Sequence, residues 1–74
     1  MNSNWIKIKV YKNAFEAEVV KQMLVENNIP AVVLNKQDSS YLFGNIELYV
    51  DKDHQAEAVA LIDSFGDDEE LNEN

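Results

Sequence analysis

The sequence predicts a small α+β fold with the element order βαββα. Residues 5–11 and 45–50 alternate apolar and polar side chains with the period of two that is typical of a strand. Residues 14–26 and 54–65 instead repeat apolar side chains at the helical spacing of three and four. A short unbroken apolar run, residues 31–34, follows the first helical pattern. Together these patterns predict three strands and two helices in one domain.

The first strand alternates along its whole length. Its aliphatic side chains are expected to face the core, and the side chains between them are expected to face water. The residues expected to face the core are Ile6, Ile8 and Val10, and those expected on the opposite face are Trp5, Lys7, Lys9 and Tyr11.

The first helix has clear signals at both ends. Asn13 is a favoured N-cap residue, and Glu16, three positions later, completes a capping-box pattern. Asn28 tolerates the left-handed conformation at a helix end, and Pro30 cannot continue the helix. The side of the helix expected to be buried carries Ala17, Val19, Val20, Met23 and Leu24.

The second half of the chain begins with a connection, residues 36–44, that changes from polar to aromatic. In the third strand Glu47 and Tyr49 are expected to point outward, between three inward aliphatic side chains. Asp51 or Asp53 then caps the second helix, and Gly66 is expected to end it. The inward residues of the strand are Ile46, Leu48 and Val50, and those of the helix are Ala58, Leu61, Ile62 and Phe65, with Val59 at the margin.

The order of the elements constrains the topology. A strand, a helix and a strand joined by short connections favour a right-handed crossover with the two strands parallel. The third strand then fits antiparallel between them, which gives the order 1-3-2. This is a ferredoxin-like βαββα arrangement without its fourth strand. Two helices cover one face of the sheet, while the opposite face and the outer edge of the first strand are left uncovered.

The composition restricts the partners and the compartment. The net charge is −8, with fourteen acidic residues and six basic ones. Five of the acidic residues fall in residues 67–74, which we interpret as a disordered tail after a single domain over residues 1–66. Such a chain is repelled by nucleic-acid phosphates and by anionic membranes. With no cysteine and no apolar leader at its start, the chain is expected to be cytoplasmic.

Two segments carry a family resemblance. FEAEVVKQMLVENNIPAVV, residues 15–33, and NIELYVDKDHQAEAVALI, residues 45–62, resemble the small bacterial DUF2007 domain, which is labelled a signal-transducing protein. The likeness spans residues 5–65, with Asn28 at a position where glycine is usual and Asp51 where proline is common. The resemblance implies a fold related to signalling proteins of the PII type, and it supplies no catalytic motif.

No pattern in the sequence indicates an active site. His54 is the only histidine, and we interpret it as a solvated residue near the start of the second helix. Asp51 and Asp53 lack the continuation of a calcium loop, and the only two glycines, Gly44 and Gly66, form no phosphate-binding loop. The sequence therefore predicts no catalytic residue, no metal ligand and no cofactor, and an enzyme is the least favoured class.

Aromatic residues supply the candidate contact sites. Tyr41, Leu42 and Phe43 form an apolar cluster within the connection, which either packs on its own domain or contacts a partner. Trp5, Tyr11 and Tyr49 are expected on the uncovered face of the sheet, where cross-strand pairing alone would also account for them.

These observations favour a non-enzymatic bacterial signalling or adaptor module that binds a protein partner or a second copy of itself. The alternative is a small-ligand sensor, by analogy with PII-type folds, with a pocket between residues 36–44 and the uncovered face. A small ligand would raise the thermal stability of the protein. A protein partner would instead be captured less well when residues of the contact surface are replaced.

Overall fold

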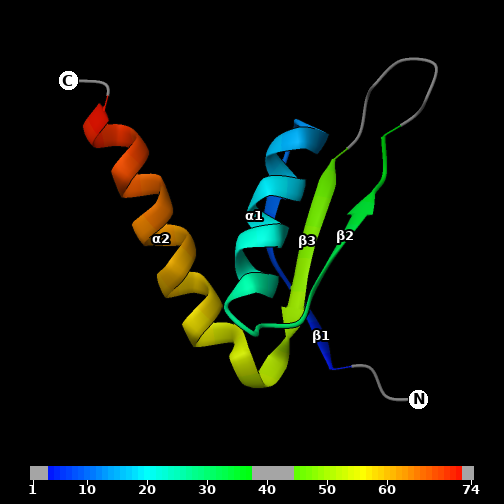
Figure 1. The fold of residues 1–74 in the computed structure, drawn as a ribbon. Coiled ribbons are helices and arrows are strands. Elements are labelled where there is room, and N and C mark those ends of the chain that lie inside the picture. The colour runs from blue at the N-terminus through cyan, green and yellow to red at the C-terminus, as the bar shows by residue number, and fades with distance from the viewer. Residues whose placement is uncertain (1–3, 38–44, 73–74) are drawn as a thin grey trace.

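The computed structural model describes residues 4–37 and 45–72, and of residues 66–72 the backbone alone. Its elements run β1 (Trp5–Tyr11), α1 (Ala14–Glu26), β2 (Ala31–Asn35), β3 (Ile46–Asp51), a single 3₁₀ turn (Lys52–His54) and α2 (Gln55–Asn72). β3 lies between β1 and β2 and is antiparallel to both (Figure 1). The predicted α+β fold, with sheet order 1-3-2 and two helices, is confirmed.

The core lies between β3 and the two helices. The three inward residues of β3, Ile46, Leu48 and Val50, are each 0% exposed, as the alternation predicts for a central strand. α1 lies across this face of the sheet (Figure 1). The helices bury Ala17, Val20 and Leu24 from α1 and Ala58 and Ile62 from α2 against the strand.

Both ends of α1 form as the sequence predicts. Asn13 is the N-cap, and its side-chain oxygen accepts a hydrogen bond from the backbone N–H of Glu16 at 3.1 Å. At the other end Asn28 has φ of 66°, the left-handed conformation that closes a helix. The N–H of Ile29 then donates to the carbonyl of Leu24 at 2.9 Å, and both side chains are buried. This hydrogen bond closes the turn from α1 to β2, and the two buried side chains join the core there.

A β-bulge at Ile8 changes the faces of β1. Lys7 pairs with Tyr49 but Lys9 pairs with Leu48, so two steps along β1 match one step along β3. The residues after the bulge therefore exchange faces, and the orientation predicted for them is wrong. Val10 is 43% exposed, whereas Tyr11, opposite the inward residue Ile46, is 6% exposed.

α2 departs from the prediction in length. The helix continues through Gly66 to Asn72, so the helix end expected at Gly66 is wrong. A glycine inside a helix costs only about 1 kcal/mol relative to alanine, which does not force a stop. α2 leans away from α1, and the two helices form a V (Figure 1). No helix in the described part of the chain is long and apolar enough to cross a membrane. The division into a domain over residues 1–66 and an acidic tail stays a prediction.

Candidate functional site

The face of the sheet turned away from the helices is largely apolar. Four large side chains on it, Trp5, Val10, Val32 and Leu34, are between 40% and 45% exposed. The strand register places them together, since Val10 and Leu34 flank Glu47, and Val32 flanks Tyr49. We call this surface the open face and define it by Trp5, Lys7, Val10, Val32, Leu34, Lys36, Glu47 and Tyr49.

A compact group of charges lies at the centre of the open face. Glu47 is 6% exposed and accepts a hydrogen bond from the Tyr49 hydroxyl at 2.8 Å. Two ammonium groups reach the same carboxylate: Lys7 Nζ lies 3.4 Å from Oε2, and Lys36 Nζ lies 3.5 Å from Oε1. The carboxylate therefore has a partner from each of the three strands or their ends, which holds it in one orientation.

The pKa values of Glu47 and Tyr49 are shifted in opposite directions. The hydrogen bond from Tyr49 is the main cause that lowers the pKa of Glu47, burial opposes it, and Lys7 and Lys36 lower the pKa further. The same hydrogen bond is the main cause that raises the pKa of Tyr49. At neutral pH the group is a carboxylate with a protonated phenol and two lysines. Because both lysine side chains are about half exposed, we expect the ion pairs to orient the group more than to stabilise the fold.

The structure places only some of the predicted contact residues on the open face. Trp5 and Tyr49 lie on the open face as predicted, while the bulge places Tyr11 on the helix side. Tyr41, Leu42 and Phe43 lie outside the described residues, as does most of the connection beside which a ligand pocket was expected. Both of these predictions therefore stay predictions.

Sequence reasoning missed three residues of the open face: Val10, Val32 and Leu34. For Val10 no signal was available, since the alternation of β1 runs unbroken across the bulge. For the other two a signal existed. The apolar run of β2 reads as a strand buried on both faces, but a sheet with helices on one face leaves alternate residues of every strand uncovered.

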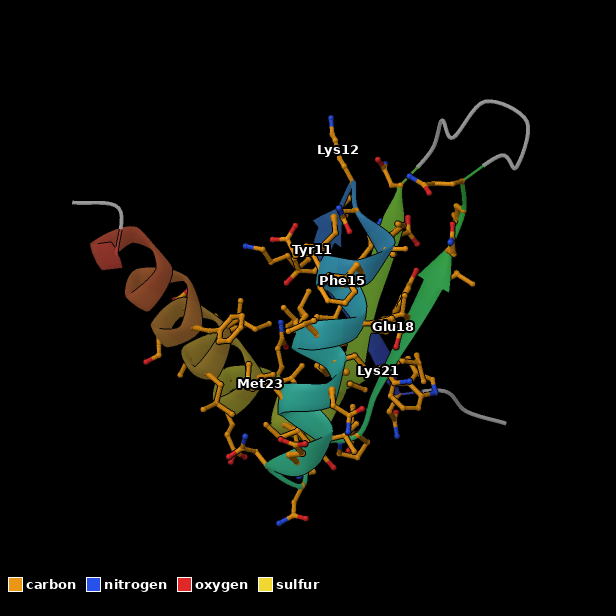
Figure 2. All side chains as sticks on the ribbon, turned by 45° about the horizontal axis from the view of Figure 1, so that its top comes forward. Tyr11, Lys12, Phe15, Glu18, Lys21 and Met23 are labelled. Atoms are coloured by element: carbon orange, nitrogen blue, oxygen red, sulfur yellow. The ribbon has the colours of Figure 1, made fainter. Side chains whose placement is uncertain are left out.

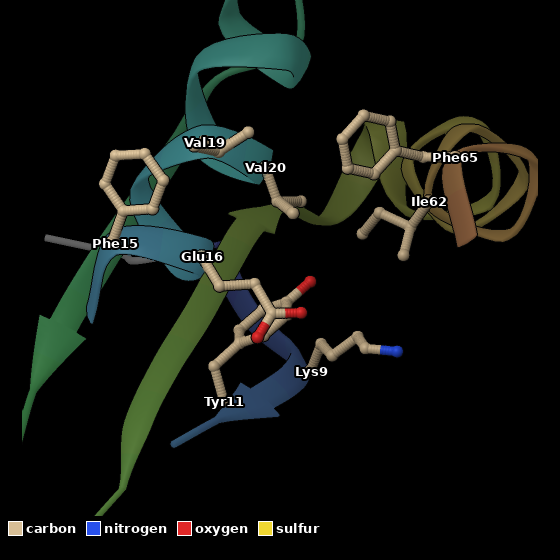
Figure 3. A pocket seen from close by; sticks show the side chains of 8 residues that line it. All are labelled: Lys9, Tyr11, Phe15, Glu16, Val19, Val20, Ile62 and Phe65. Carbon is tan, nitrogen blue, oxygen red and sulfur yellow. The ribbon is translucent and has the colours of Figure 1, made fainter. Parts of the chain in front are cut away.

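The opposite side of the sheet carries a cleft of about 370 Å³ between α1 and α2. Tyr11 forms part of its floor, and Phe15 and Phe65 stand at its two sides (Figure 3). Figure 2 shows Tyr11 and Phe15 together at the N-terminal end of α1, with Met23 toward the other end of the helix. The residues that line the cleft are Lys9, Tyr11, Phe15, Glu16, Val19, Val20, Ile62 and Phe65.

Tyr11, in the floor of this cleft, has a strongly raised pKa. Burial raises its pKa to about 12, and the carboxylate of Glu16 contributes in the same direction. Lys9 Nζ lies 5.8 Å from the centroid of the Tyr11 ring. The floor of the cleft therefore holds a phenol that is neutral at pH 7, with Lys9 and Glu16 near it.

We expect Tyr11 to ionise near pH 12 and the folded protein to lose stability as the pH rises from 10 to 12. The unfolded chain, with a pKa near 10, releases the phenolic proton first, so ionisation favours unfolding across this range. After a discount for solvent beside the open cleft, we expect the loss to reach about 1–2 kcal/mol. The comparison of wild type with Tyr11→Phe, by tyrosinate absorbance and by urea unfolding at each pH, measures both effects. Ionisation of Tyr11 near pH 10 would contradict the burial argument.

The single histidine pairs locally. His54 Nδ1 lies 3.2 Å from Asp51 Oδ2, across the 3₁₀ turn that leads into α2. Among the residues that the structure describes, no group of three or more histidine, cysteine, aspartate or glutamate side chains is placed to hold a metal ion. Asp51 stands at the N-cap position of this turn as predicted, but its side chain makes no capping hydrogen bond there and contacts His54 instead.

Comparison with known proteins identifies a family. The family model DUF2007, described as "Putative prokaryotic signal transducing protein", matches residues 5–66. The match starts at the first residue of β1 and ends one residue after Phe65, so it includes the whole sheet, α1 and both sides of the cleft. No curated protein and no solved structure matches the chain.

Proposed function

The chain belongs to the DUF2007 family, and from this membership we propose that it is a non-enzymatic cytoplasmic signalling module that binds a protein partner through the open face. The family description supports the signalling part of this proposal. The open face supports the binding part. The sequence supports the non-enzymatic part, since it has no cysteine and only one histidine from which to build an activated nucleophile.

One observation carries the proposal: large apolar side chains are exposed together on one face. A domain of 74 residues has a thin core and gains stability from every apolar side chain that it buries. Here Trp5 and Val10 of β1 and Val32 and Leu34 of β2 are left 40–45% exposed on the same face, on the two strands that flank β3. Single exposed apolar residues are ordinary, but several large ones exposed on the same face of a sheet are a feature of contact surfaces.

The charges on the open face favour a different protein over a second copy. The side chains of Lys7 and Lys36 are 49% and 54% exposed, while that of Glu47 is 8% exposed, so the charge presented to a partner is positive. Two copies joined through this face would bring four lysines together. A partner with an apolar centre and acidic groups around it would complement the face.

We expect Leu34→Ser to reduce partner binding by at least about fivefold, because it replaces an exposed apolar side chain of the open face with a hydroxyl. Val25→Ser is the matched control, since Val25 is similarly exposed, at 43% against 45%, but lies on α1. Partners captured from bacterial extract by wild type and by the control, but not by Leu34→Ser, are then purified and titrated. Trp5 is the only tryptophan and belongs to the open face, so its emission should shift to the blue on binding.

Two results would contradict this proposal. The first is capture of the same proteins, with equal affinity, by Leu34→Ser and by wild type. The second is light scattering that shows a stable dimer of the wild-type chain and a monomer of Leu34→Ser, which would assign the open face to self-association.

A further inference from the structure

We propose that the cleft between α1 and α2 is a second docking site, and that its occupant is a basic amphipathic helix of a partner protein. The site lies on the helix side of the sheet, so the inference goes beyond the proposed function of the open face and does not depend on it. Its support comes from the shape of the cleft, from the exposure of its aromatic residues and from the charges around it.

The shape of the cleft suits a helix. Phe15 and Val19 are four positions apart on α1, and Ile62 and Phe65 are three positions apart on α2, so each wall is a ridge of side chains one turn long. The two helices diverge toward the N-terminal end of α1 and the C-terminal end of α2 (Figure 1). Tyr11 lies between the two walls of the cleft (Figure 3). A third helix placed in such a V packs its own ridge between the other two. The volume of about 370 Å³ suits a few anchoring side chains.

The two phenylalanines of the cleft are exposed to water although buried apolar residues lie next to them. Phe15 is 76% exposed and Phe65 is 40% exposed, although both stand beside the buried residues Val20 and Ile62. Val19, on the wall with Phe15, is 37% exposed. An apolar helix face laid in the cleft would remove all three side chains from water. Large aromatic residues at the edge of a partly formed pocket are the usual anchors of such an interface.

The charges decide which occupant fits. Glu16 lines the cleft, and Asp63 lies one position beyond Ile62 on α2. Lys9 is the one basic residue in the lining. A second copy would bring its own Glu16 and Asp63 toward the same two acidic residues. Lysine or arginine residues along the edges of an amphipathic helix would be attracted.

The test uses a synthetic helix as its probe. The probe is a labelled peptide of leucine and lysine, about 18 residues long, with leucines at positions i, i+3, i+4 and i+7. A comparison peptide has the same composition but leucines spread around the helix, and a third replaces lysine with glutamate. Fluorescence anisotropy at about 0.15 M salt measures binding to the full chain. We expect the first peptide to bind and the other two to bind at least about tenfold more weakly.

Replacements of residues that line the cleft test whether the peptide binds there. We expect Phe65→Ser and Phe15→Ser each to weaken binding about tenfold, and Glu16→Gln to weaken it about twofold and reduce its salt dependence. Phe15 is so exposed that its replacement leaves the core intact, so this variant serves even where Phe65→Ser disturbs the fold. Val25→Ser on α1 and Leu34→Ser on the open face are the controls and should bind as wild type does. A failure of the open-face proposal therefore leaves this result unchanged.

Several outcomes would overturn the inference. Equal binding of the comparison peptide would show simple charge attraction, and equal binding by Phe15→Ser and Phe65→Ser would place the peptide elsewhere. A dimer in light scattering that Phe65→Ser dissociates would make a second copy the occupant. A nucleotide or central metabolite that raises the melting temperature of wild type, but not that of Phe65→Ser, would make the cleft a small-ligand site.

Discussion

Replacement of Leu48 with alanine is expected to lower the free energy of unfolding by about 3–5 kcal/mol. Leu48 is 0% exposed and lies in the middle of β3, where it pairs with Lys9 of β1 and Val33 of β2. The cavity left by the missing atoms is enclosed by neighbours on both sides and by the helices, so it cannot collapse easily. At about 0.05–0.15 kcal/mol per residue, a chain of this length has little stability to lose.

Urea unfolding followed by far-ultraviolet circular dichroism measures the Leu48→Ala effect. Val25→Ala is the control, because Val25 is 43% exposed and its truncation should change the stability by no more than about 0.5 kcal/mol. Leu48→Ala should have a much lower midpoint, and it should lose part of its structure in the absence of denaturant. A loss below about 1 kcal/mol would mean that β3 is not the centre of the core.

The sequence is sufficient to predict the topology because the relevant signals are local and strong. Asn13 and Asn28 mark the ends of α1 by the hydrogen bonds that they make or permit, and these are short-range effects. The alternation of β3 predicts its three inward aliphatic residues correctly, since β3 is the central strand and has a regular register with β2. It does not predict that Glu47, on the opposite face, is buried as well. With the helix ends and the inward faces fixed, few arrangements of three short strands remain.

The candidate sites are less predictable, since each depends on geometry that no single segment encodes. The bulge at Ile8 leaves the alternation of β1 intact in the sequence and changes only how β1 is matched to β3. The cleft depends on the angle between α1 and α2, and on an α2 that continues through Gly66. Neither helix pattern specifies that angle, so Phe65 reads as a core residue in the sequence but is 40% exposed in the structure.

The bulge also gives β1 a protected edge. β1 is an outer strand, and an extended outer strand can pair with another chain. A bulge interrupts the regular row of backbone groups, and Lys7 and Lys9 on either side of it disfavour a close apolar neighbour. We therefore favour contacts through the open face and the cleft over the addition of a strand at β1.

Tyr11→Ala should cost about 3 kcal/mol in the free energy of unfolding, whereas Val10→Ala should cost less than about 1 kcal/mol. Tyr11 is 6% exposed beside the core and Val10 is 43% exposed on the open face, because the bulge exchanges their faces. A strand that alternated without interruption would bury Val10 and expose Tyr11, so it predicts the opposite order. Tyr11→Phe, which keeps the ring and removes the hydroxyl, should stay within about 1 kcal/mol of wild type. Urea unfolding of the three variants decides between the two registers, and a larger loss for Val10→Ala than for Tyr11→Ala would show that the bulge is absent.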